Sequence, residues 1–127
     1  MIFEADNDTR GLWDRGRLAQ VVSNLIGNAI QHGARGGPID VRVGDRGEVV
    51  SLVVHNQGPP VPAELLPSIF DPFRRGNAHA TSKTDGLGLG LFIVREMVRA
   101  HYGEIVAHST EAEGTTFTVR LPRVPPR

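Results

Sequence analysis

The segment DGLGLGL, residues 85–91, carries a glycine at every second position, and the apolar-periodic run FIVREMVRAHYG follows it directly. Glycine has no Cβ, so Gly86, Gly88 and Gly90 allow the backbone to reach positive φ and to bring N–H groups close to a ligand. When a helix follows, those N–H groups lie at the positive end of its dipole, where anions bind. The spacing matches neither the GxxxxGKS/T loop nor a strand-first GxGxxG, so it indicates a phosphate site only together with other residues.

Two asparagines, Asn24 and Asn28, lie four residues apart in an apolar-periodic run. This spacing places both side chains on one face of a helix, one turn apart. One interpretation is a solvated polar face. The other is that an amide oxygen serves as a neutral, hard ligand of the kind that Mg²⁺ accepts beside phosphates. Gln31 and His32 extend the region, and the sequence alone favours His32 as a residue that interacts with the helix dipole.

Asn56 follows the almost wholly apolar run VVSLVVH, residues 49–55, and precedes the turn formers QGPP. It either makes an Asx turn or is fixed at the end of a buried strand, where its side chain could bind the polar edge of a planar ligand. Further on, residues 74–84 read RRGNAHATSKT, with Arg74, Arg75 and Lys83 making the segment locally basic. A loop of that length is long enough to be functional, and it adjoins the glycines.

These residues need a framework of helices and strands. Apolar residues with a period of 3.6 predict helices over 17–31, capped by Asp14 and ended by Gly33, and over 90–101. A short helix is expected over 62–69, before the aromatic pair Phe70 and Phe73. The predicted strands are an edge strand within 1–12, a hairpin of 39–43 and 49–55 turning at 44–47, a strand after Gly103, and a last strand over 115–122. Residues 123–127 are expected to be a frayed end or a linker.

Composition limits the classes of function. The chain has 127 residues, enough for one domain with a sizeable core. Its 14 basic and 14 acidic residues cancel, so no strong net field draws it to nucleic acid or to a membrane surface. There is no cysteine, and no apolar run long enough for a membrane span or a signal peptide, so a cytoplasmic location is expected.

Five motifs occur in order: DRGRLAQVVSNLIGNAIQHG, HNQGPPVP, IFDPFRRG, DGLGLGL and EGTTFTVRLP. Together they resemble the N, G1, F and G2 boxes and the closing strand of the ATP-binding catalytic domain of bacterial sensor histidine kinases. That domain belongs to the gyrase, chaperone and mismatch-repair ATPase superfamily. Each motif alone is moderate evidence, but five in this order and spacing, over residues 14–122, are strong evidence.

The resemblance implies roles at individual positions. Asn28 is the expected Mg²⁺ ligand with Asn24 beside it, and Asn56 meets the adenine amino group where the family most often has Asp. A neutral amide accepts that hydrogen bond without the charge of an aspartate, and a lower affinity for adenine is one consequence. Gly58 matches the glycine that lets the backbone approach the base. The other positions assigned to the nucleotide site are Gln31, His32, Phe73, Gly86, Leu87, Gly88, Leu89, Gly90 and Thr115.

The resemblance also assigns residues 74–85 to a flexible ATP lid, in which Arg74, Arg75 and Lys83 are the phosphate-side candidates. Two departures from the family pattern stand out. Gln31 replaces a Lys that often contacts phosphate, and Tyr102 replaces a small residue after His101.

The implied fold is an α/β, two-layer sandwich (Bergerat fold), with a mixed, mostly antiparallel sheet and three helices on one face. Hydrolysing members of the superfamily carry a Glu one turn before the Mg²⁺ asparagine. Here that residue is Asn24, which cannot act as a base near pH 7. The implied site therefore holds ATP and passes its γ-phosphoryl group to another molecule.

Two hypotheses follow. In the first, residues 1–127 are the catalytic domain of a two-component histidine kinase. Its phosphoacceptor histidine lies on a separate dimerisation domain and it acts upstream of a response regulator, since none of the five histidines lies in an acceptor-like motif. In the second, the chain is a non-catalytic nucleotide-binding regulatory module, or a serine-kinase relative that acts on a protein partner.

Overall fold

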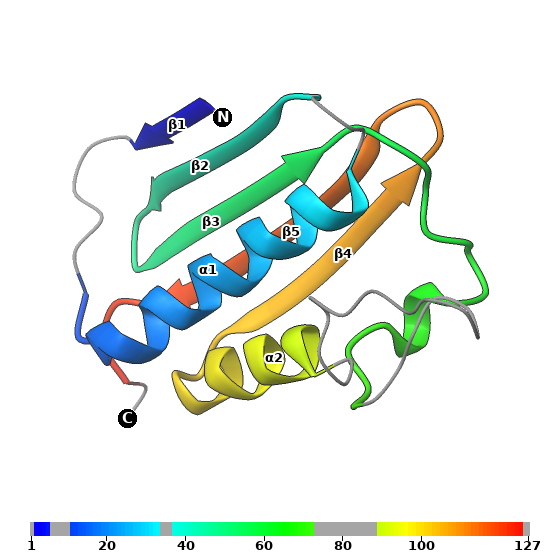
Figure 1. Cartoon of the computed structure of the whole chain (residues 1–127). Helices are drawn as coiled ribbons and strands as arrows, with labels where there is room; N and C mark the ends of the chain where they lie inside the picture. Colours follow the sequence, from blue (N-terminus) through cyan, green and yellow to red (C-terminus); the bar gives the residue numbers. More distant parts are fainter. Residues whose placement is uncertain (1, 6–10, 34–36, 73–88, 126–127) are drawn as a thin grey trace.

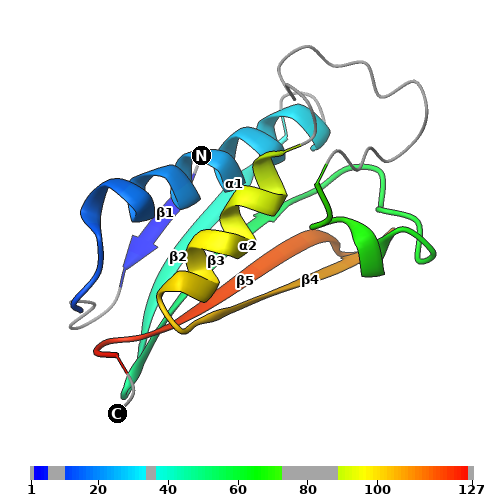
Figure 2. The same cartoon turned by 90° about the horizontal axis from the view of Figure 1, so that it is seen from below.

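In the part of the chain that the structure describes, a five-stranded sheet carries two α-helices on one face (Figure 1). The structure, a computed structural model, describes residues 2–5, 11–33, 37–72 and 89–125. Its elements, in chain order, are β1 Ile2–Ala5, α1 Arg15–His32, β2 Ile39–Arg46, β3 Val49–Asn56, the 3-10 helix η1 Leu66–Ser68, α2 Gly90–Ala100, β4 Glu104–Thr110 and β5 Gly114–Pro122. Seen from below, both α-helices lie on the same side of the sheet (Figure 2).

The sheet has the strand order β1-β2-β3-β5-β4. β1 pairs in parallel with β2, and the other three pairings are antiparallel. The prediction of a mixed, mostly antiparallel sheet is therefore confirmed, as is the edge position of the first strand. β3 lies between β2 and β5, so the prediction that this strand is central is confirmed.

The two α-helices run antiparallel and are joined near both ends of α2. Asp14 caps α1, because its Oδ1 accepts a hydrogen bond from the Arg17 N–H. The Asp14 N–H in turn donates to His101 Nε2 just after α2, at 3.1 Å. His101 Nδ1 lies 2.8 Å from the Met97 carbonyl, so the ring carries its proton on Nδ1. At the other end of α2, Asn24 Nδ2 donates to the Gly90 carbonyl at 3.3 Å.

The core lies between the helices and the sheet. α1 contributes Val21, Leu25 and Ala29 at the spacing of one helical face, and α2 contributes Val94 and Val98. The sheet side is formed by alternate residues of β2, β3 and β5: Val41, Leu52, Val54, Phe117, Val119 and Leu121. None of the described helices is both long enough and apolar enough to span a membrane.

The prediction of a third α-helix over 62–69 is wrong. The structure forms only the single 3-10 turn η1 there, so in the described part of the chain two α-helices cover the sheet instead of the expected three. Pro67 lies inside the predicted helix and has no N–H to donate to the carbonyl four residues earlier. The segment instead uses tighter bonds over three residues, such as that from the Ser68 N–H to the Leu65 carbonyl at 3.0 Å.

Two further predictions are corrected around the β2–β3 hairpin. β2 extends to Arg46, so the turn is not 44–47 but the residue pair Gly47 and Glu48, with Gly47 at φ 78°. Arg123, expected in the frayed end, is held by this turn. Its NH2 donates to Asp45 Oδ1 and its Nε to the Gly47 carbonyl, both at 2.7 Å.

Tyr102 adopts the left-handed conformation, with φ 64°, directly after the C-terminal cap of α2. The Gly103 N–H donates to the Val98 carbonyl and the Tyr102 N–H to the Arg99 carbonyl, each at 2.9 Å. This pair of bonds is a Schellman motif, whose left-handed position is usually glycine. The tyrosine side chain is 62% exposed, so little packing offsets the cost of its Cβ.

Replacing Tyr102 by glycine should therefore stabilise the fold. We expect Tyr102→Gly to raise the free energy of unfolding by about 1 kcal/mol in chemical denaturation. Tyr102→Ala is the matched control, because it removes the same ring but keeps the Cβ. A glycine variant no more stable than the alanine variant would contradict the assignment of strain to this position.

Candidate functional site

Asn56 is the last residue of β3 and is 4% exposed. Its Nδ2 donates to the carbonyl of Gln57 at 3.0 Å. With the amide nitrogen on that carbonyl, the amide oxygen is the atom that remains to accept a hydrogen bond from a ligand. The expectation that this side chain is fixed at the end of a buried strand is confirmed.

Two glycines allow neighbouring elements to approach Asn56 closely. A Cβ on Gly33, where α1 ends, would lie 3.2 Å from both Cβ and Nδ2 of Asn56. A Cβ on Gly114, where β5 begins, would overlap the carbonyl oxygen of Asn56. Gly114 also has φ 79°, which other residues rarely adopt. The end of β3 is thus enclosed between α1 and the β4–β5 turn.

Hydroxyl groups continue this polar end of the sheet. Thr115 is the cross-strand partner of Asn56 on one side and of Ser109 on the other. It is 6% exposed, and its Oγ1 lies 2.7 Å from Ser109 Oγ. Ser109 Oγ also accepts the N–H of Val61 at 2.8 Å. An amide and two hydroxyls therefore lie in a row across one end of the sheet, on the face that the helices cover. We call this row the polar end of the sheet.

The asparagines of α1 lie where that helix meets α2. Asn24 and Asn28 are both half-buried, and Asn24 contacts the Gly90 carbonyl as described above. Leu89, the N-terminal cap residue of α2, makes no side-chain hydrogen bond to the helix. The first N–H groups of an α-helix have no partner within the helix and favour an anion, so the anion site at this helix start stays a prediction.

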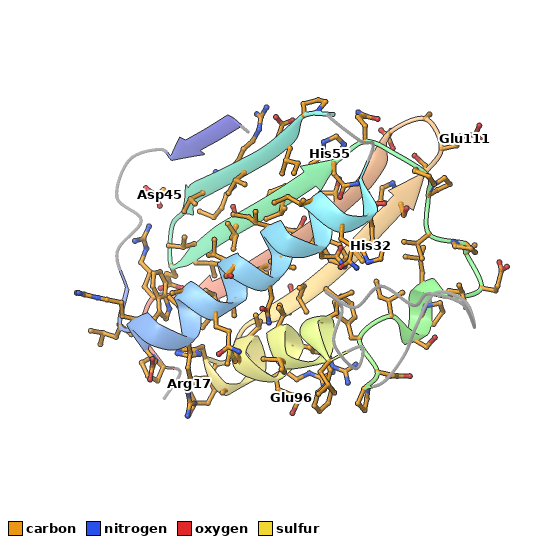
Figure 3. All side chains as sticks on the ribbon, viewed as in Figure 1. Arg17, His32, Asp45, His55, Glu96 and Glu111 are labelled. Carbon is orange, nitrogen blue, oxygen red and sulfur yellow. The ribbon has the colours of Figure 1, made fainter. Side chains whose placement is uncertain are left out.

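The structure brings several predicted site residues together and leaves others untested. Asn56 and Thr115 are paired, and Asn24 contacts Gly90. Gly58 has φ 131°, a conformation that favours glycine. Gln31 and His32 are the last residues of α1, and Figure 3 shows His32 at the same end of the molecule as His55 near the tip of β3. The predicted positions Phe73, Arg74, Arg75, Lys83, Gly86, Leu87 and Gly88, and with them the lid, lie outside the described residues.

The donor set around Asn28 suits a hard cation that is shared with phosphates. The described part of the chain contains no group of three His, Cys, Asp or Glu side chains that could hold a metal ion by themselves. Mg²⁺, however, keeps several waters and binds through one or two protein oxygens plus substrate phosphates. A half-buried amide at Asn28, one helical turn from the contact between Asn24 and Gly90, fits that mode of binding.

Comparison with known proteins decides the family. Residues 13–125 match the model of the histidine kinase-, DNA gyrase B- and HSP90-like ATPases. The chain belongs to this ATPase family. The matched residues include α1, β2 to β5 and α2.

Its similar proteins are sensor kinases. This ATPase-family chain is 37% identical to the signal transduction histidine-protein kinase AfsQ2 of Streptomyces coelicolor over 97% of its own length and 22% of the relative. It is 38% identical to the sensor histidine kinase WalK of Bacillus subtilis, over 86% of the chain and 18% of that relative. The catalytic domain of histidine kinase ThkA superposes with a TM-score of 0.83 at 39% identity, over 98% of this chain and 78% of that chain. The chain thus spans about a fifth of its curated relatives' length.

Two features of this ATPase domain were not predicted from the sequence. Ser109 was not singled out, although a strand after Gly103 and a last strand over 115–122, if they form a hairpin, bring it close to Thr115. His55 was quoted within a motif, but neighbouring residues of a strand point to opposite faces. It therefore lies on the uncovered face of the sheet, with Nδ1 3.7 Å from Asp40 Oδ2 and Nε2 against the Glu113 carbonyl.

The close contact between Gly114 and the backbone of Asn56 can be tested by replacing Gly114 and, as a control, Gly47 by alanine. Gly114 and Gly47 have almost the same φ, 79° and 78°, but a Cβ on Gly47 would meet nothing within 4 Å. We expect Gly47→Ala to cost about 1 kcal/mol of unfolding free energy, from backbone strain alone, and Gly114→Ala to cost about 3 kcal/mol. Equal losses in the two variants, measured by denaturation, would show that Asn56 is not held by this contact.

Proposed function

We propose that the chain binds Mg·ATP and donates the γ-phosphoryl group to a histidine of a separate dimerisation domain, as the catalytic domain of a two-component sensor histidine kinase. The observation that carries this proposal is the 39% identical superposition on a histidine kinase catalytic domain over 98% of the chain. The names of the relatives favour the kinase hypothesis over a regulatory module or a serine kinase.

We assign the base to the polar end of the sheet. The Asn56 amide oxygen would accept from the adenine amino group, with Thr115 beside it and Gly58 letting the backbone approach the ring. The burial of Asn56 supports this assignment, because water that would compete for the same hydrogen bond is excluded. The bond between Nδ2 and Gln57 supports it as well, since it presets the amide for an amino group.

We assign the phosphates to the junction of α1 with the N-terminus of α2. The N–H groups at Leu89 and Gly90 would bind phosphate oxygens, and Asn28 would hold Mg²⁺, with Asn24 beside it. When bound, Mg²⁺ would neutralise part of the phosphate charge. Arg74, Arg75 and Lys83 remain proposed phosphate-side residues, and Gln31, His32, Phe73, Gly86, Leu87 and Gly88 remain proposed parts of the site.

The same residues lead us to expect little hydrolysis of ATP by the chain itself. Asn24 cannot take a proton from water near pH 7, and its Nδ2 is already bound to the Gly90 carbonyl. The chain would therefore contribute position and charge, while the nucleophile comes from the partner domain.

We further propose a cytoplasmic location and a single ATP-binding domain over residues 1–127, with the phosphoacceptor histidine outside it. A downstream response regulator would take the phosphoryl group from that histidine. Support for such a partner comes from a structural neighbour, histidine kinase ThkA, which was solved in complex with the response regulator TrrA and superposes with a TM-score of 0.79.

The metal assignment predicts the effect of one substitution. Asn28→Ala should weaken the binding of Mg·ATP about tenfold or more, because the cation loses a direct protein ligand. Gln20→Ala, on the exposed face of the same helix, is the matched control and should bind as the wild type does. Calorimetry with and without Mg²⁺ measures both. Unchanged Mg·ATP affinity in a folded Asn28→Ala variant would refute the assignment.

A second prediction concerns turnover. The isolated chain should bind ATP but release phosphate very slowly, and it should not label itself, because it has neither a base at Asn24 nor an in-line acceptor. Incubation with γ-labelled ATP and Mg²⁺ follows both free phosphate and labelled protein. Rapid stoichiometric labelling of the chain would contradict the separate-acceptor model and favour the serine-kinase alternative.

A further inference from the structure

The hydroxyl of Ser109 joins three segments that meet at the polar end of the sheet. It accepts the Val61 N–H at 2.8 Å and lies 2.7 Å from Thr115 Oγ1. Val61 follows the turn that contains Gly58, Ser109 lies in β4, and Thr115 lies in β5. One side chain therefore connects the turn after β3 with the two strands beyond it.

The strand register explains why this position matters. Ser109, Thr115 and Asn56 are consecutive cross-strand partners over β4, β5 and β3, so their side chains lie in one row on the helix-covered face. Ser109 is the outermost of the three, at the edge of the sheet. Its hydroxyl contacts that of Thr115, and Thr115 is the direct cross-strand neighbour of Asn56.

We propose that Ser109 is a positioning residue for the nucleobase: it does not touch the base but orients Thr115, the cross-strand neighbour of Asn56. This inference rests on the proposed function, which places adenine at Asn56 and Thr115. Ser109 uses one lone pair for Val61, and one hydrogen bond joins the two hydroxyls. Thr115 is therefore held in one orientation, with its remaining capacity available to the base.

Removal of the Ser109 hydroxyl leaves two groups without a partner. The Val61 N–H loses its acceptor, and Thr115, which is 6% exposed, loses the neighbour that orients it. Since one neutral hydrogen bond is in question, we expect Ser109→Ala to weaken Mg·ATP binding about fivefold. ITP has an oxo group where ATP has the amino group, so the same substitution should weaken the binding of Mg·ITP much less.

A double-mutant cycle separates positioning from simple loss of structure. The variants are Ser109→Ala, Thr115→Val and the double variant, with Mg·ATP and Mg·ITP affinities measured by calorimetry on protein whose folding is checked by thermal unfolding. If Ser109 acts through Thr115, the double variant should bind ATP no more weakly than Thr115→Val alone. Ser109→Thr, which keeps the hydroxyl, should restore the ATP preference. Ser51→Ala, a buried serine of β3 paired with Gly44 and Arg120, is the matched control.

Each outcome decides the proposal. Equal losses for ATP and ITP, additive losses in the double variant, or no loss at all would overturn it while leaving the proposed function intact. A wild-type chain that binds no Mg·ATP would overturn the proposed function itself, and this inference with it. Should Ser109→Ala fail to fold, Thr115→Val decides, because an unchanged ratio of ATP to ITP affinity in that variant contradicts a role of Thr115 at the base.

Discussion

The contact between Gly114 and the backbone of Asn56 is the constraint on which the polar end of the sheet depends. It leaves no space for a Cβ, and it requires φ 79° at Gly114. Because β5 starts at this contact, its position fixes the register in which Thr115 faces Asn56. A shift of one residue would turn Thr115 and every other inward side chain of β5 to the opposite face. The steric contact thus sets both the core and the candidate base site.

The helix layer is held over that sheet end by polar contacts as well as by the core. α1 and α2 share buried valines and leucines, yet apolar packing is not directional and does not fix their relative sliding. The hydrogen bonds from Asp14 to His101 and from Asn24 to Gly90 are directional, and they fix the position of α2 along α1 at both ends of α2. They keep the N-terminus of α2 beside the asparagine face of α1. The proposed site for phosphates and a cation therefore depends on the way in which the two helices are joined.

Much of this arrangement was predictable from the sequence. The periodicity of 17–31 and 90–101, the Asp14 cap, the central β3 and the position of Asn56 at its end followed from apolar patterns and turn residues. Pro67 was a visible reason to doubt a regular helix over 62–69. The turn residues of the β2–β3 hairpin were misplaced because Gly44 and Gly47 are equally good turn formers. Pairing with Ser51 keeps Gly44 in the strand.

Other features depend on tertiary contacts that no local pattern records. The bonds of Arg123 to Asp45 and Gly47 join residues far apart in the chain. The orientation of the Asn56 amide depends on the Gln57 carbonyl, and the roles of Gly33 and Gly114 depend on what lies against them. Ser109 gains its importance only once β4 and β5 are paired. The metal and phosphate assignments came from the family resemblance, because two asparagines on a helix do not by themselves indicate a nucleotide.

The central claim is that the nucleotide lies between the polar end of the sheet and the asparagine face of α1. The most direct measurement is an NMR titration of the ¹⁵N-labelled chain with Mg·ATP, which observes the side-chain amides of Asn24, Asn28 and Asn56 together with the backbone. The account predicts that these three amides and the N–H groups of Gly58, Thr115 and Gly90 shift most. Shifts that concentrate instead on the uncovered face of the sheet, around Arg42, His55 and Thr118, with the three amides unchanged, would contradict it.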